Sequence, residues 1–326
     1  MRDYRSMKHK KLGLGCSTFG GSKSKQTALR ALEDAFSLGI NYFDIARSYG
    51  YGQAESIVGE FIQGKRDQVV LTSKFGITPP RPFPFMHQVK DVVRFAKKWV
   101  PEFTQKIIQT YSNNQVTRPP ITPRLAIETM EKSLKELKTD YLDFYLLHDC
   151  PFENAAREDV AAAMNKAKDK GMVKAWGAAC ENADDLNKYF NHSPSFDVLQ
   201  FPYEINSQWV KKQINPPPTK VLFSVMSKSA GLKEPEENFF KSLFINQLAP
   251  GLVQNLQEAW LYIASQEFDR GVVLCSMTQR HHIERNLAII NAPDISETAL
   301  LAMKNKLIGK TSTPAPIPKQ WRMSKA

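Results

Sequence analysis

Asn41-Tyr-Phe-Asp-Ile-Ala-Arg-Ser-Tyr-Gly50 combines a short apolar run with two reactive side chains. The apolar residues 40–43 predict a buried strand that ends on the carboxylate of Asp44. The phenol of Tyr49 follows five residues later, beside a glycine that permits a sharp turn. Neither side chain suits a strand interior, so we expect both at the C-terminal end of the strand. Catalytic side chains collect at that rim in parallel α/β proteins.

Two further buried strands end in the same way. Val69-Val-Leu-Thr-Ser73 leads to Lys74, and Tyr141-Leu-Asp-Phe-Tyr-Leu-Leu147 leads to His148. Taken singly, these residues have simpler interpretations, such as a turn carboxylate, a rim aromatic, a solvated charge and a core imidazole. Together, an acid, a phenol, an amine and an imidazole at strand ends are a proton-handling set.

The rest of the chain alternates predicted strands with amphipathic helices. The remaining strands are expected at 12–16, 173–178, 197–201, 221–226 and 271–275. Helices are expected at 27–38, 55–62, 122–137, 159–170, 252–265, 282–290 and 296–308, with another capped near Asn182. Eight strands without a composition break predict one (β/α)8 TIM barrel over residues 1–310. A dinucleotide fingerprint is not favoured, because Gly13-x-Gly15-x-x-Thr18 lacks its third glycine.

Two segments interrupt this alternation. Residues 77–121 open and close with proline-rich stretches and form a predicted long insertion after the third strand. Connections of this length are often functional, so the insertion is either a lid over the barrel mouth or an inert surface segment. Residues 311–326 are rich in proline and lysine and predict a flexible, disordered basic tail.

The net charge of +11 is concentrated in three segments. Residues 1–11, 87–118 and 301–326 carry net charges of +4, +4 and +6, which leaves −3 on the rest of the chain. This distribution favours a solvated surface over a specific nucleic-acid site. No apolar run reaches membrane-spanning length, and residues 1–11 lack the apolar core of a signal peptide. We therefore expect a cytoplasmic protein without a membrane partner; the sequence carries no signal for an oligomeric state.

Four cysteines follow predicted strands at Cys16, Cys150, Cys180 and Cys275. None belongs to a C-x-x-C pair, so no metal site is expected. Their positions would place all four around one mouth of the barrel. Small apolar fillers are favoured over a redox-sensitive cluster.

The sequence resembles the aldo-keto reductase superfamily. The strongest matching motifs are Asp44-Ile-Ala-x-x-Tyr49-Gly50, Leu71-Thr-Ser-Lys74 and Ser133-Leu-Lys-Glu-Leu-Lys-Thr-Asp-Tyr-Leu-Asp-Phe-Tyr-Leu-Leu-His148. Weaker matches are Gly171-Met-Val-Lys-x-Trp-Gly177, Gln200 and Ile283-Glu-Arg-Asn286. The resemblance covers roughly residues 11–310 outside the insertion. It assigns the family's catalytic tetrad to Asp44, Tyr49, Lys74 and His148.

The resemblance also implies a mechanism, in which a carbonyl receives a hydride and a proton. Tyr49 would donate the proton, and the cation of Lys74 would favour its phenolate form. Asp44 would keep Lys74 charged and in place. His148 would orient the carbonyl oxygen and stabilise its developing charge.

The cofactor implied by the resemblance is NADPH, with NADH less favoured. The cofactor-binding residues that it implies are Gly15, Thr18, Asp44, Gln200, Ser224, Ser276, Thr278, Arg280, His282 and Asn286. Two positions depart from the family pattern. Ala179-Cys180 stand where Ser-Asn is usual, and Arg285 precedes Asn286 where an acidic residue is usual.

The expected function is NADPH-dependent reduction of a small aldehyde or ketone, or the reverse oxidation. The alternative is a catalytically weak or inactive barrel that senses a cofactor or binds a partner. The altered Ala179-Cys180 site and the insertion motivate this alternative. A third hypothesis is a binder of nucleic acid or anionic surfaces that uses the basic segments.

Overall fold

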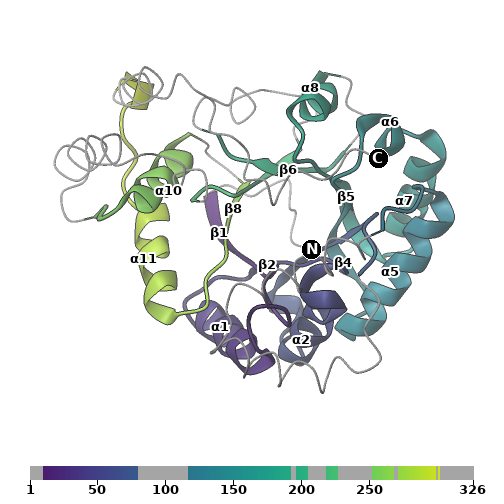
Figure 1. Cartoon of the computed structure of the whole chain (residues 1–326), viewed down its shortest axis with the longest axis horizontal. Helices are drawn as coiled ribbons and strands as arrows, with labels where there is room; N and C mark the ends of the chain where they lie inside the picture. The colour runs from purple at the N-terminus through teal and green to yellow at the C-terminus, as the bar shows by residue number, and fades with distance from the viewer. Residues whose placement is uncertain are drawn as a thin grey trace, which may run out of the picture.

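Eight parallel strands close into a barrel in the computed structural model, which describes residues 10–79, 117–191, 196–204, 218–226, 252–267, 271–298 and 300–301 (Figure 1). The strands are β1 (Lys10–Gly15), β2 (Tyr42–Asp44), β3 (Val70–Phe75), β4 (Leu142–His148), β5 (Val173–Ala179), β6 (Val198–Pro202), β7 (Thr219–Phe223) and β8 (Gly271–Cys275). Each strand pairs with its neighbours in sequence, and β1 closes the ring against β8. The predicted TIM barrel is confirmed.

Helices surround the ring of strands (Figure 1). They are α1 (Lys25–Ser37), α2 (Ala54–Phe61), α5 (Pro123–Leu137), α6 (Phe152–Ala155), α7 (Glu158–Asp169), α8 (Ala183–Asn191), α10 (Leu256–Gln266) and α11 (Arg280–Ile290), with 3₁₀ turns η2 (Tyr49–Gly52) and η3 (Arg66–Gln68). The start of α5 shows why the sequence was informative: Thr122 accepts a hydrogen bond from the Leu125 amide at 3.1 Å, and Pro123 occupies the first turn. No helix in these ranges is both long and apolar enough to cross a bilayer.

Two predicted elements differ from the structure by three or more residues at one end. The seventh strand ends at Phe223 instead of residue 226, because Ser224 has a φ of 56°, a left-handed conformation that leaves the extended region. The helix predicted from residue 252 begins at Leu256. Asn255 caps it, and its side-chain oxygen accepts a hydrogen bond from the Glu258 amide at 2.9 Å.

The two ends of the predicted insertion meet beside the end of β3. The Thr78 amide donates to the Thr117 carbonyl oxygen at 3.0 Å. The described chain therefore stops and resumes at neighbouring positions. Residues 80–116, most of the helix predicted at 296–308, and the tail at 311–326 lie outside the described residues.

Side chains from alternate positions fill the barrel interior, and Gly13 makes room for them. A Cβ atom on Gly13 would lie 2.7 Å from Leu274, 2.8 Å from Val272 and 2.9 Å from the ring of Tyr42. Tyr42 is 1% exposed and its hydroxyl accepts a hydrogen bond from Thr72 at 2.6 Å. The first glycine of the Gly13-x-Gly15 pair thus serves packing inside the barrel.

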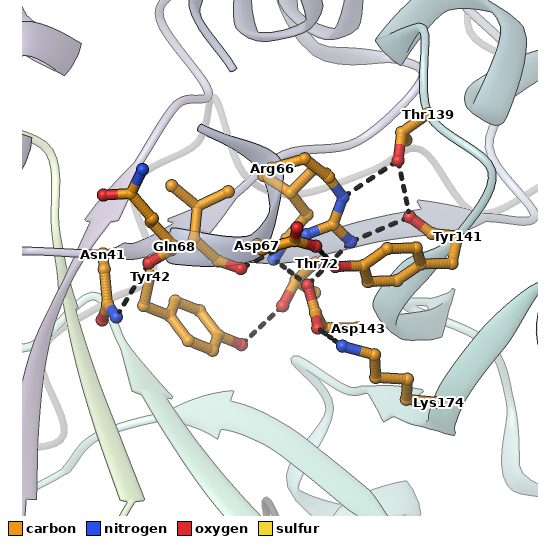
Figure 2. A network of polar contacts seen from close by, with 12 residues as sticks. Asn41, Tyr42, Arg66, Asp67, Gln68, Thr72, Thr139, Tyr141, Asp143 and Lys174 are labelled. Carbon is orange, nitrogen blue, oxygen red and sulfur yellow. Dashed lines mark hydrogen bonds and ion pairs between the residues drawn. The ribbon is translucent and has the colours of Figure 1, made fainter. Parts of the chain in front are cut away.

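A buried carboxylate ties three strands together at their N-terminal ends (Figure 2). Asp143 on β4 accepts hydrogen bonds from Arg66, from Lys174 on β5 and from the Leu71 amide on β3, each at 2.9 Å. The Arg66 guanidinium also lies 3.6 Å from the ring centroid of Tyr141. A fully buried charge with several partners strongly restricts how these strands align.

We predict that Gly13→Ala destabilises the barrel by about 1–3 kcal/mol, because the added methyl group overpacks the interior. Equilibrium unfolding in urea would measure the change. Gly21→Ala is the matched control, since the nearest atoms to its added Cβ lie 3.5 Å away. Equal stability of the two variants would contradict the packing argument.

Candidate active site

The four predicted catalytic residues meet at the C-terminal end of the barrel. Asp44 is the last residue of β2, His148 is the last residue of β4, and Lys74 lies one residue before the end of β3. Tyr49 begins the η2 turn that follows β2. Because all strands are parallel, these ends share one rim. Asp44 and Lys74 are only 3% and 2% exposed.

Lys74 is the centre of the site. Its Nζ donates to Asp44 Oδ2 at 2.6 Å, to the Ile45 carbonyl oxygen at 3.1 Å and to Tyr49 Oη at 3.2 Å. Burial lowers the pKa of Lys74, but the interactions with Asp44 and Tyr49 raise it more, so that it lies above its usual value. The amine therefore carries its proton and uses all three of its hydrogens.

A tight turn presents the Tyr49 phenol to Lys74. Gly50 and Tyr51 both have left-handed backbone conformations, with φ of 58° and 57°. A Cβ atom on Gly50 would lie 1.7 Å from the Phe19 carbonyl oxygen, so only glycine fits there. This close approach gives the Tyr49-Gly50 pair of the sequence motif a physical reason.

The pKa of Tyr49 differs from the sequence-based expectation in its net direction. Burial raises the pKa of the phenol, and the Lys74 ammonium lowers it by a smaller amount. Lys74 lowers the pKa of Tyr49 as expected, but this effect is smaller than the rise that burial causes. The phenol therefore keeps its proton at neutral pH and is available as a donor.

His148 stands against the Tyr49 ring as a neutral imidazole. The two ring centroids are 5.7 Å apart, with an angle of 82° between the planes. Burial lowers the pKa of His148 well below its usual value, and the cations of Lys74 and Arg118 lower it further. Its buried Nδ1 has no hydrogen-bond partner among the described residues. A neutral imidazole has one donor and one acceptor, which suits it to a carbonyl oxygen.

Gln200 connects the predicted catalytic residues to the predicted cofactor site. Its Nε2 donates to Asp44 Oδ1 at 3.1 Å, and the side chain is 3% exposed. Its buried Oε1 has no partner in the described part of the chain. Gly15 pairs in register with Asp44, and a Cβ atom on Gly15 would lie 3.2 Å from Ser276 Oγ. These predicted cofactor residues therefore share the rim with the tetrad.

Two other predicted cofactor residues make their contacts elsewhere. Arg280 donates to Glu284 at 2.9 Å and to Asp34 at 3.3 Å, and its side chain is half exposed. The buried amide of Asn286 is directed at the Met277 sulfur at 3.1 Å. A thioether is a weak acceptor, so Asn286 contributes to packing beneath the segment that joins β8 to α11.

The remaining predicted cofactor residues are exposed or partly buried. Ser276 and His282 are exposed, whereas Thr18, Ser224 and Thr278 are partly buried. Apart from Thr18 and Ser224, they belong to the segment between β8 and the first turn of α11.

The four cysteines are buried and free. Burial raises the pKa of Cys150, Cys180 and Cys275 to about 12, and it raises the pKa of Cys16 as well. Thiols in this state are poor nucleophiles, which agrees with their interpretation as small buried side chains.

Three charged residues near the site escaped the sequence analysis. Arg118 donates to the carboxylate and carbonyl oxygen of Asp149, directly after His148.

Glu55, which is 1% exposed, binds Arg47 of the loop that carries Tyr49. A signal for Glu55 was present, because it shares the apolar face of a predicted helix with Val58.

We predict that His148 makes the protein less stable in mild acid. Below a pH of about 6.5 the imidazole binds a proton in the unfolded chain but not in the folded chain, so stability falls as pH falls. Between pH 7.5 and 5.5 the wild type should lose on the order of 1 kcal/mol more than His148→Gln. Urea unfolding at both pH values would measure this difference. Tyr49→Phe retains the imidazole and should follow the wild type; parallel losses in all three proteins would refute the assignment.

Comparison with known proteins identifies relatives of this chain. A sequence profile of the Aldo/keto reductase family matches residues 11–216. An aldo-keto reductase of Bacillus subtilis (strain 168) is 27% identical over 212 residues, which are 63% of this chain and 54% of the relative. An NADH-specific methylglyoxal reductase of Escherichia coli (strain K12) is 28% identical over 216 residues, 63% of this chain and 59% of the relative. The chain thus spans little more than half the length of these relatives.

Solved structures share the fold. A crystal structure of an aldo-keto reductase from Klebsiella pneumoniae in complex with NADPH has a TM-score of 0.58 and 20% sequence identity. The match covers 97% of this chain and 94% of that one. At this identity the comparison supports the barrel architecture.

Proposed function

This chain belongs to the aldo/keto reductase family, and from that membership we propose that it catalyses the NADPH-dependent reduction of an aldehyde or ketone, or the reverse oxidation. One observation carries the proposal: a buried ammonium, Lys74, donates to the Asp44 carboxylate and to the Tyr49 phenol together. That arrangement supports proton transfer at Tyr49 better than it supports packing.

Each residue of the site has a role in the proposed reaction. When bound, NADPH supplies a hydride to the carbonyl carbon. Tyr49 gives its hydroxyl proton to the carbonyl oxygen, which leaves a phenolate. Lys74, already 3.2 Å from that oxygen, stabilises the phenolate charge. Asp44 keeps Lys74 protonated and fixed in direction.

His148 acts on the substrate oxygen. As a neutral imidazole it donates a hydrogen bond to the carbonyl oxygen while the carbon is attacked. The product is an alcohol whose new hydrogens come from the hydride and from Tyr49. The phenolate is reprotonated from solvent before the next turnover.

The residues present fit a nicotinamide. Gln200 Oε1 is a buried acceptor without a partner in the described residues, and it lies on the side chain that also binds Asp44. A carboxamide N–H would satisfy that oxygen. This unsatisfied acceptor is our reason to place the nicotinamide ring next to the tetrad.

We assign the phosphate end of the cofactor to the segment after β8. Arg280 and His282 are exposed at the start of α11 and can meet a 2′-phosphate. The Klebsiella pneumoniae structure is a complex with NADPH, whereas the Escherichia coli relative is NADH-specific. NADPH is therefore the proposed cofactor, and NADH is the comparison to test. Methylglyoxal, named in that relative, is a suitable carbonyl probe.

A cofactor-sensing or partner-binding protein is the second candidate. Ala179 stands where the family has a polar residue, and its methyl group faces the barrel interior without a hydrogen-bonding atom. The missing hydrogen-bonding atom would weaken binding of the nicotinamide carboxamide. A protein that binds NADPH but reduces no carbonyl in a broad panel would favour this second candidate.

We predict that Tyr49→Phe lowers kcat for methylglyoxal reduction by at least about 100-fold, because the proton donor is lost. Its Kd for NADPH, measured by quenching of protein fluorescence, should stay within about twofold of wild type, since the phenol acts on the substrate. Tyr51→Phe, in the same turn, is the matched control and should keep wild-type turnover. Full activity of Tyr49→Phe would show that the proton donor is wrongly assigned.

We predict that Gln200→Leu weakens NADPH binding about 3- to 10-fold, the range for one lost hydrogen bond. Fluorescence titration with NADPH measures this directly and does not depend on turnover. The same titration with NADH should show a similar ratio, because the nicotinamide is common to both cofactors. An unchanged Kd for both would remove Gln200 from the site.

A further inference from the structure

Glu55 is a buried carboxylate that takes no part in the proposed reaction. It lies in the first turn of α2 and is 1% exposed. Its Oε1 accepts a hydrogen bond from Ser73 Oγ at 2.7 Å, and its Oε2 pairs with Arg47 Nη1 at 3.1 Å. The Arg47 side chain is itself only 17% exposed. A single carboxylate thus bridges two segments of the chain.

The two bridged segments are the ones that carry the amine and the phenol. Ser73 precedes Lys74 on β3, and its side chain is fully buried. Arg47 lies between Asp44 and Tyr49, in the loop that follows β2. The relative position of β3 and this loop sets the distance between Lys74 Nζ and Tyr49 Oη.

The loop needs such a restraint. Tyr51, two residues after Tyr49, is held in a left-handed conformation, which is unfavourable for a residue with a side chain. An unfavourable backbone conformation of this kind persists only where several surrounding contacts hold it in place. A loop that moved away would take Arg47 from Glu55 and leave a buried carboxylate without its cation, which is strongly unfavourable.

We propose that Glu55 is a positioning residue, which ties the Tyr49 loop to the Lys74 strand through Arg47 and Ser73 and so keeps Tyr49 Oη within hydrogen-bonding distance of Lys74 Nζ. Glu55 touches no reacting atom in this scheme. The proposal deepens the proposed function and rests on it.

Glu55→Gln isolates the ionic half of the bridge. The amide oxygen still accepts from Ser73, but the charge that holds Arg47 is gone. We expect kcat for methylglyoxal reduction to fall at least about tenfold, with KM and the Kd for NADPH unchanged within about twofold. A crystal structure of the variant should show the Tyr49 Oη to Lys74 Nζ distance increased from 3.2 Å to beyond hydrogen-bonding range.

Arg47 supplies the reciprocal variants. Arg47→Met should reproduce the loss of kcat, and the double variant Arg47→Met with Glu55→Gln should lose no more than either single variant. Arg47→Lys keeps a cation within reach and should recover most of the activity. If Glu55→Gln fails to fold, Arg47→Met and Ser73→Ala carry the test, because each removes one partner and leaves the carboxylate in place.

The matched control is the ion pair at the other end of the barrel (Figure 2). Arg66 and Asp143 are 15% and 0% exposed in their side chains, close to the 17% and 2% of Arg47 and Glu55. Asp143→Asn should lower the unfolding midpoint but leave kcat and the distance between Tyr49 and Lys74 unchanged. A general loss of stability is thereby separated from a local effect on the loop.

Two results would overturn the proposal. One is a Glu55→Gln protein with wild-type kcat and an unchanged 3.2 Å contact. The other is an equal loss of kcat in Glu55→Gln and Asp143→Asn, which would indicate a general structural effect. A wild type without carbonyl reduction would refute the proposed function instead, and the crystal structure of Glu55→Gln would still decide whether Glu55 positions the loop.

Discussion

The buried ammonium of Lys74 constrains the rest of the structure. A charge that is 2% exposed is tolerated only if its three hydrogens find acceptors, and they find Asp44, the Ile45 carbonyl oxygen and Tyr49. Those acceptors come from one strand end and the turn after it. The pairing of β2 with β3 and the shape of the turn are therefore fixed by the contacts of one nitrogen atom. The same contacts stabilise the fold and arrange the proposed proton donor.

Two buried charge clusters lie at opposite ends of the barrel. At the C-terminal end, one ammonium faces a phenol and a neutral imidazole, groups that can exchange a proton or a hydrogen bond. At the N-terminal end, Asp143 is enclosed by two cations and a backbone amide, which satisfies its oxygens. Among the described residues, His148 Nδ1 in the first set has no hydrogen-bond partner, whereas the second set uses its hydrogen bonds to hold strands together. This contrast supports the proposal of a reactive site at the C-terminal end and a structural cluster at the N-terminal end.

Sequence periodicity predicted the barrel and placed Asp44, Lys74 and His148 at strand ends, because each of them closes an apolar run. The resemblance to a known family added the role of Tyr49, which lies in the turn after the second strand. The sequence could not locate Glu55 as a partner of Arg47, since their contact depends on how α2 packs against β3. Burial also decided the net pKa of Tyr49, which a list of neighbouring charges does not reveal. The sequence also did not reveal that Ser224 adopts a left-handed conformation, which ends β7 early.

The hydrogen bond between Thr78 and Thr117 means that the chain is closed across the base of the segment between them. Thr78 and Thr117 are therefore neighbours in space, close enough for a short turn to join them. If the segment between them were exchanged or shortened during evolution, Lys74 and the barrel strands would stay in place. The strands that carry Lys74 and His148 can therefore be inherited unchanged while the sequence between Thr78 and Thr117 diverges.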